Sequence, residues 1–179
     1  MNLPNFLSFL RIFLVPAFIW LVLNDHIHGA LVLFVLAGIT DALDGFIAEK
    51  FNQVTELGKF LDPLADKVLI ASGFVTLTIN GLIPLWITLI VMTRDLVIVA
   101  GAIVFQLLTG SLRMEPLSLS KVNTLMQIVF IAITMAEDLY PDLSSLKNTL
   151  LIIVSITTIL SGIIYIFVWT KRAVEREVS

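Results

Sequence analysis

The stretch from Asp41 to Asp66, DALDGFIAEKFNQVTELGKFLDPLAD, decides the fold of this chain. It places four aspartates in a sequence that is otherwise mostly hydrocarbon: Asp41, Asp44, Asp62 and Asp66. On membrane-insertion scales, an aspartate at the centre of a helix costs roughly 2.5–3.5 kcal/mol. Helix packing gives no reason to gather four of them, so the pattern indicates that a cation holds them together.

The spacing within this stretch predicts two helices joined by a turn. The first set of residues recurs at i, i+3, i+4 and i+7: Asp41, Asp44, Gly45 and Ala48. The second set recurs at i, i+4 and i+8: Gly58, Asp62 and Asp66. Each set lies on one face of a helix. The segment 49–57 between them is short and polar, so two antiparallel helices would direct two carboxylates each toward one point.

Such a cluster of carboxylate oxygens suits Mg²⁺, Mn²⁺ or Ca²⁺. Four carboxylates can hold two divalent ions about 3.5–4 Å apart, the spacing used for displacement at phosphorus. Gly45 and Gly58 lack side chains, which leaves room for a bulky ligand close to the backbone. The alternative is a set of acids at solvated helix ends. It is less favoured because Asp41 lies about two turns inside an apolar run.

The composition predicts an integral membrane protein with one domain, residues 1–179. The chain is 58% hydrophobic, and its mean hydropathy of +1.01 is far above that of a soluble domain. It has no cysteine, which excludes a disulfide framework. Its formal net charge of −3 argues against nucleic acid as a partner.

The apolar runs predict an all-α fold with six transmembrane helices, preceded by a short interfacial N-terminal segment. The expected spans are Ile12 to Leu23, Ala30 to Ala48, Gly58 to Ile79, Leu82 to Leu108, Leu119 to Ala136 and Asn148 to Trp169. Lysine and arginine are concentrated on one side of these spans, which places both termini and the acidic motif in the cytoplasm. His26 and His28, in the first turn, are interpreted as exposed polar residues rather than ligands.

The acidic stretch also resembles the signature of the CDP-alcohol phosphotransferase family, D-x2-D-G-x2-A-R-x8-G-x3-D-x3-D. Every spacing from Asp41 to Asp66 matches. Glu49 stands where the family usually has arginine. The beginning of the chain is similar to the family's P-N-x2-T-x2-R, with serine in place of threonine: Pro4, Asn5, Ser8 and Arg11.

The resemblance implies roles for these residues. Two divalent cations, Mg²⁺ or Mn²⁺, would be held by Asp41, Asp44, Asp62 and Asp66. Asp66 would be either a ligand or the general base. The nucleotide and diphosphate would lie against Asn5, Arg11, Asp44, Gly45, Ala48 and Gly58. From the residues alone, Arg11 is equally compatible with an interfacial anchor and with a phosphate contact.

Three further cations are candidates for binding the acceptor: Lys67, Arg94 and Lys121. A charged pair such as Arg94 and Asp95 inside a membrane span is a functional candidate by default. The alternative is an internal ion pair that fixes helix packing. Lys67 follows Asp66 directly, and it would either neutralise surplus carboxylate charge or contact a phosphate.

The reaction implied by the resemblance is transfer of a phosphatidyl group from CDP-diacylglycerol to an alcohol, with release of CMP. Phosphatidylglycerol is the favoured acceptor and glycerol 3-phosphate the alternative, because a phosphodiester needs fewer cations than a phosphate dianion. The resemblance also implies a homodimer and a site in the bacterial inner membrane that faces the cytoplasm. An ion-coupled transporter is a remote alternative, since intramembrane acids also mark ion pathways.

Overall fold

The structure, a computed structural model, describes the backbone of residues 3–50, 56–109 and 118–177. It describes the side chains of residues 10–40, 65–101, 103 and 119–168. Over these residues the fold is all-helical, as predicted, and contains no strand. The elements are α1 (Leu3–Leu23), α2 (Ile27–Lys50), α3 (Glu56–Ile79), α4 (Leu85–Thr109), α5 (Ser118–Ala136), the short 3₁₀ helix η1 (Pro141–Leu143) and α6 (Ser144–Glu177).

The six α-helices correspond in order to the six predicted spans. In the described part of the chain, two stretches are long and apolar enough to cross a membrane, Leu119–Ala136 and Pro141–Val168. The stretches Leu10–Leu23 and Ile27–Thr40 are apolar but shorter. One expectation is not met: α1 runs without a break from Leu3, so residues 3–11 continue the first helix instead of forming a separate segment.

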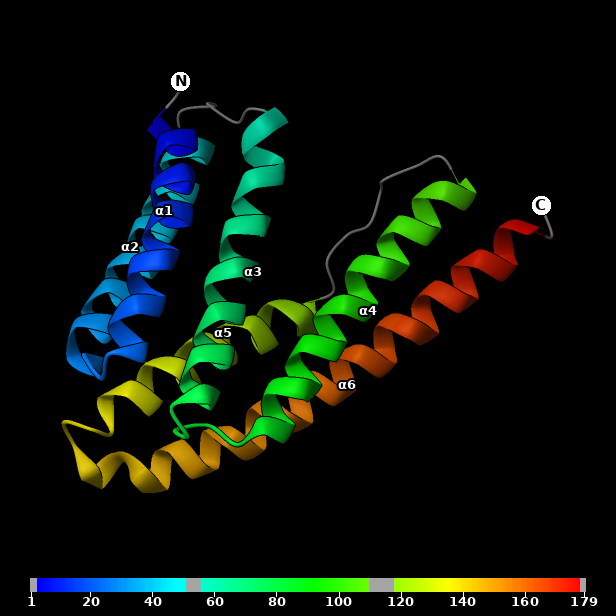
Figure 1. Ribbon diagram of the computed structural model, residues 1–179. Helices are drawn as coiled ribbons and strands as arrows, with labels where there is room; N and C mark the ends of the chain where they lie inside the picture. Colours follow the sequence, from blue (N-terminus) through cyan, green and yellow to red (C-terminus); the bar gives the residue numbers. More distant parts are fainter. Residues whose placement is uncertain (1–2, 51–55, 110–117, 178–179) are drawn as a thin grey trace. The chain divides into compact units, whose positions relative to one another are not determined.

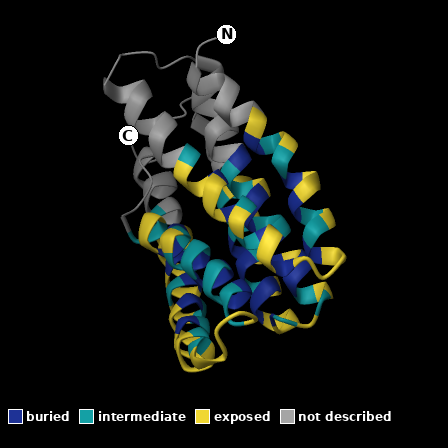
Figure 2. Cartoon of the chain, turned by 90° about the vertical axis from the view of Figure 1, so that its left-hand side faces the viewer, coloured by how far each residue is buried: buried dark blue, intermediate teal, exposed yellow. Residues whose placement is uncertain are grey.

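The chain divides into two compact units. Unit 1 comprises Met1–Ile83 and Ile131–Ser144, and unit 2 comprises Pro84–Phe130 and Ser145–Ser179. Along the described helices, each turn carries both buried and exposed residues, as Figure 2 shows. This is the pattern expected when one face of each helix packs inside the protein.

In unit 1, α1 packs against both α2 and α3, and successive helices run in opposite directions (Figure 1). The rings of Phe18 and Phe34 join α1 to α2, with centroids 5.7 Å apart. Asn80 follows α3 and donates from Nδ2 to the carbonyl of Val22, at 2.6 Å, and to Oδ1 of Asp25, at 3.3 Å. These bonds fasten the end of α3 to the turn between α1 and α2.

In unit 2, polar side chains connect α4, α5 and α6. Arg94 of α4 donates to Ser120 of α5 and to Ser161 of α6. Further along the α5–α6 contact, Oδ1 of Asn123 accepts hydrogen bonds from Thr157 at 2.8 Å and Thr158 at 2.9 Å. Hydrogen bonds between helices of apolar sequence fix their relative register.

Candidate active site

The acidic motif lies on two neighbouring helices of unit 1, as its spacing predicts. Asp44 lies six residues before the last residue of α2, and Asp62 lies six residues after the first residue of α3. Asp41 and Asp66 lie nine and ten residues from the same two helix ends. α2 and α3 follow one another in the chain and run in opposite directions (Figure 1), so the four acids lie at two similar levels, counted in residues from the end of α2 and from the start of α3. With a rise of 1.5 Å per residue, these levels are about 9 Å and about 14 Å from the helix ends.

Several predicted site residues lie outside the described side chains: Asn5, Asp41, Asp44, Gly45, Ala48, Gly58 and Asp62. Among the residues whose side chains are described, no group of three or more histidines, aspartates or glutamates is placed to hold a metal ion. Asp66 is the only one of the four acids in that set. The geometry of a metal cage therefore stays a prediction, while the helical placement of its four acids is observed.

Asp66 forms an ion pair with Arg11. Nη1 of Arg11, on α1, lies 2.5 Å from Oδ1 of Asp66, on α3. The Arg11 side chain is 1% exposed, whereas that of Asp66 is 38% exposed. A side chain this buried is not an anchor that reaches out to the membrane surface. Of the two interpretations left open by the sequence, the burial of Arg11 argues against the interfacial anchor, and the phosphate contact stays a prediction.

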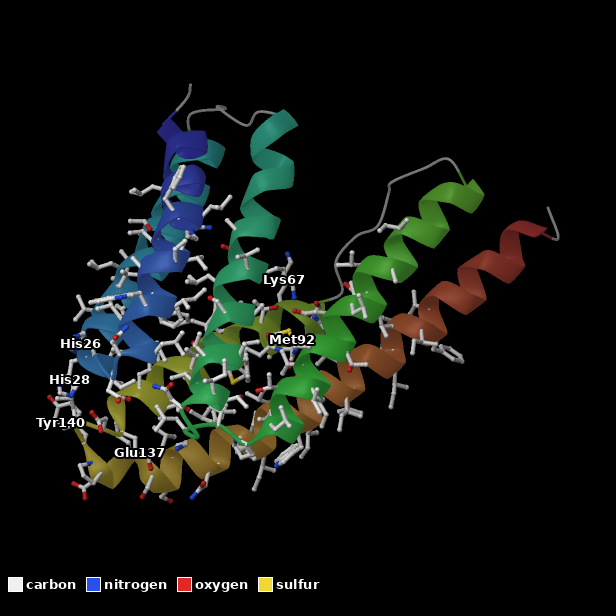
Figure 3. The ribbon with its side chains drawn as sticks, in the orientation of Figure 1. His26, His28, Lys67, Met92, Glu137 and Tyr140 are labelled. Atoms are coloured by element: carbon white, nitrogen blue, oxygen red, sulfur yellow. The ribbon has the colours of Figure 1, made fainter. Side chains whose placement is uncertain are left out.

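The arrangement of acids fits divalent cations in its donor chemistry. Carboxylate oxygens are the ligands that Mg²⁺ and Mn²⁺ prefer. α2 and α3 each carry two aspartates, so the acidic motif contains four such groups. The charge of Arg11 partly offsets that of the acids. Lys67, which is half-buried on α3, adds a second cation next to Asp66 in the sequence (Figure 3).

The two other predicted acceptor residues lie in unit 2. Lys121 is exposed on α5. Arg94 is 5% exposed and is held by several groups. Its Nη1 donates to Asp95 at 2.7 Å, and its Nη2 donates to Ser120 at 2.5 Å and to Ser161 at 2.6 Å. The guanidinium carbon also lies 5.8 Å from the centre of the Tyr165 ring, within cation–π distance. Arg94 therefore connects all three helices of unit 2.

A buried polar seam between α5 and α6 was not predicted from the sequence. Asn123, Gln127 and Thr158 are fully buried, and Ser161 is nearly so. Gln127 donates from Nε2 to Oγ1 of Thr158 at 3.5 Å. The spacing of Ser118, Lys121 and Thr124 in the sequence predicts a polar stripe on α5, whereas the seam is formed by other residues of this helix. The signal that could have revealed the seam is the spacing of Thr157, Thr158 and Ser161 within an apolar run.

The two histidines lie at the opposite end of unit 1 from the acidic motif. His26 and His28 are both exposed, as predicted, and they are found at the same end as Glu137 and Tyr140 (Figure 3). Nε2 of His28 lies 3.3 Å from Oδ2 of Asp138, and both side chains are 59% exposed. An ion pair this exposed contributes little to stability.

The sequence matches the family profile described as CDP-alcohol phosphatidyltransferase over residues 1–169. The chain belongs to this family. It is 37% identical to the cardiolipin synthases (CMP-forming) of Rattus norvegicus and Homo sapiens over 155 residues, which is 78% of this chain. The match covers 51% and 52% of those two proteins, so the chain spans about half their length.

A second kind of CDP-alcohol phosphatidyltransferase is also similar to this chain. The CDP-diacylglycerol–glycerol-3-phosphate 3-phosphatidyltransferase of Bacillus subtilis is 32% identical over 161 residues, covering 80% of this chain and 81% of that protein. The names of these relatives differ in the acceptor that they imply. Membership of the CDP-alcohol phosphatidyltransferase family indicates an enzyme of that type.

Proposed function

We propose that the protein transfers a phosphatidyl group from CDP-diacylglycerol to a hydroxyl of phosphatidylglycerol and releases CMP. The observation that carries this proposal is that two aspartates fall within α2 and two within α3 in a member of the CDP-alcohol phosphatidyltransferase family. The identity of 37% to two CMP-forming cardiolipin synthases supports the choice of acceptor.

In this proposal, Asp41, Asp44, Asp62 and Asp66 hold two divalent cations, Mg²⁺ or Mn²⁺. When bound, these ions neutralise the diphosphate, orient it and stabilise the charge that develops on the leaving phosphate. Asn5, Arg11 and the small residues of the motif bind the CDP group. Gly45, Ala48 and Gly58 leave the backbone accessible to a bulky nucleotide.

In the same proposal, Asp66 accepts a proton from the acceptor hydroxyl. The oxygen of that hydroxyl attacks the phosphorus of the phosphatidyl group, the bond from this phosphorus to the CMP oxygen breaks, and CMP leaves. A carboxylate that only coordinates metals is a weak base, so the base must keep partial freedom from coordination. Arg11 fixes the orientation of the Asp66 carboxylate through the bond at Oδ1.

The two candidate functions differ in the acceptor. Arg94 is paired with Asp95, so the pair has little net charge to offer a phosphate dianion. A phosphodiester, with one negative charge, suits Arg94 and Lys121 better, which favours phosphatidylglycerol. Glycerol 3-phosphate is the second candidate, supported by the relative from B. subtilis that matches over 81% of its length.

We further propose that all six α-helices span a membrane, with both termini and the acidic motif on the cytoplasmic side of a bacterial inner membrane. Lysine and arginine bias between the predicted loops supports this orientation. The family resemblance supports a homodimer.

The test is an acceptor panel with purified protein in lipid nanodiscs. CMP release and lipid product are measured with CDP-diacylglycerol and either phosphatidylglycerol or glycerol 3-phosphate, in Mn²⁺ or Mg²⁺. We expect product from phosphatidylglycerol. Product from glycerol 3-phosphate alone would select the second candidate, and no metal-dependent CMP release with either acceptor would refute both.

A further inference from the structure

A cavity of about 350 Å³ lies between α4 and α6 of unit 2. This volume is within the range of pockets that bind small molecules. Six of the residues that line it are aliphatic: Leu89, Ile90, Val97, Ile159, Ile163 and Ile166. No reaction step proposed above uses this cavity.

The lining residues give the cavity an elongated form. On α4 they recur from Leu89 to Val97, and on α6 from Thr158 to Ile166, in each case about every four residues. Eight residues of helix extend about 12 Å. Gly162 lies midway along the α6 wall, where an added Cβ would be 3.5 Å from Cγ of Arg94. The cavity is therefore a groove along two helices, suited to a chain rather than to a compact polar molecule.

Each wall of the groove carries a buried polar group. Arg94 and Thr158 both line it, and they are 5% and 0% exposed. The guanidinium is held rigidly by Asp95, Ser120 and Ser161. A groove that is aliphatic along its length, with one arginine in its wall, complements a lipid chain attached to a singly charged phosphodiester.

We propose that this groove binds an acyl chain of the acceptor phospholipid. The inference rests on the proposed function and deepens it, because phosphatidylglycerol has acyl chains and glycerol 3-phosphate has none. The residues proposed to bind the donor diphosphate belong to α1, α2 and α3 in unit 1. The groove and its arginine belong to unit 2, as does Lys121, so the groove shares this unit with both predicted acceptor residues, which supports the acceptor lipid as its occupant.

Photo-crosslinking in nanodiscs tests the groove without relying on turnover. The probe is phosphatidylglycerol with a diazirine in the middle of one acyl chain, and the cross-linked residues are identified by mass spectrometry. We expect labelling on α4 and α6 between Leu89 and Val97 and between Thr158 and Ile166. Unlabelled phosphatidylglycerol should compete, and unlabelled CDP-diacylglycerol should compete weakly.

A variant that fills the groove provides the comparison. Gly162→Leu should reduce labelling at these sites about tenfold, the change that corresponds to roughly 1.4 kcal/mol of lost binding. Ala100→Leu, at an exposed position of α4 outside the groove, is the matched control and should label normally. If Gly162→Leu does not fold, Ile163→Trp replaces it, since Ile163 is an exposed residue on the groove wall.

The outcomes separate the groove from the proposed function. Labelling that is spread evenly over the apolar surface, or that is unchanged in the Gly162→Leu variant, would overturn the proposal of acyl-chain binding in the groove, even if CMP release is normal. Competition by CDP-diacylglycerol alone would also overturn it, because the groove would then hold the donor. If the acceptor panel shows turnover only with glycerol 3-phosphate, the proposed function fails, whereas specific labelling would still establish a phospholipid groove.

Discussion

Arg11 and Asp66 form an ion pair across 55 residues of sequence, with Nη1 and Oδ1 2.5 Å apart. The pair joins α1 to α3 and connects the two parts of the sequence that carry the family resemblance. Arg11 is almost completely buried, so its charge is not shared with bulk water. A hydrogen bond between ionised groups is stronger than a neutral one. Arg11 is thereby a determinant of where the Asp66 carboxylate points.

Arg11→Met should lower both stability and activity. Removal of the guanidinium leaves the partly buried Asp66 carboxylate without this partner, which costs about 1–3 kcal/mol. The double variant Arg11→Met/Asp66→Asn should recover most of the loss in thermal unfolding temperature but none of the turnover. Equal turnover by Arg11→Met and the unmodified protein would contradict the proposed role of Arg11.

Asp62→Asn should abolish turnover while the helical content is kept. Asparagine has nearly the same shape but lacks the negative charge that a divalent cation requires. Even residues that only support metal ligands cost 10–100-fold when changed, so we expect a fall in kcat of about 100-fold or more. Circular dichroism controls for folding. Full turnover in this variant would show that the metal roles are assigned wrongly.

Glu49→Arg, which restores the residue usual in the family, should keep activity. Glu49 belongs to the last turn of α2, beyond the two levels at which the acids lie. We expect kcat to change by less than about threefold, since Glu49 is not one of the acids proposed to hold the cations. A large gain in turnover would instead indicate that the missing arginine limits diphosphate binding.

Chelation with EDTA should stop CMP release, and added Mn²⁺ or Mg²⁺ should restore it. Four carboxylates without cations repel one another, so metal should also raise the thermal unfolding temperature, by an amount that grows with the logarithm of the metal concentration once this exceeds Kd. The double variant Asp41→Asn/Asp62→Asn is the control, and its unfolding temperature should respond weakly to metal. Metal-independent turnover of the unmodified protein would contradict the proposed cofactor.

Substitutions around Arg94 distinguish its two interpretations. Arg94→Lys keeps the charge but loses the fork that reaches Asp95, Ser120 and Ser161 together. Ser161→Ala removes only the hydrogen bonding between Arg94 and Ser161. If Arg94 binds the acceptor, the lysine variant should raise the KM for phosphatidylglycerol about tenfold or more, and the alanine variant much less. If Arg94 only fixes helix packing, both variants should lower the unfolding temperature and leave KM unchanged.

The helices could be predicted from the sequence, but their exact ends could not. α1 begins at Leu3 because a proline is tolerated in the first turn of a helix and nothing from Asn5 to Arg11 interrupts it. α6 begins at Ser144, directly after η1, which starts at Pro141. In both cases the helix begins several residues before the apolar run, and the periodicity of the apolar residues does not show where it begins.

The candidate site could be predicted in part, because local spacing decides which residues share a helix. The assignment of two acids to α2 and two to α3 follows from such spacing. The contact of Arg11 with Asp66 depends instead on the rotation of α1 against α3, which no local pattern encodes. The burial of Asn123 is similar. The predicted polar stripe of α5 included Lys121, which is exposed, whereas the adjacent face carries the hydrogen bonds to α6.

The depth of the acids has a consequence for competing reactions. Asp44 and Asp62 lie six residues inside their helices, about 9 Å from the ends. In the proposed membrane orientation, phosphoryl transfer would take place below the headgroup surface, where water is scarce as a nucleophile. A hydroxyl carried by a neighbouring lipid reaches this depth more readily than bulk water. The activated lipid would then be consumed in synthesis, with little hydrolysis to phosphatidic acid.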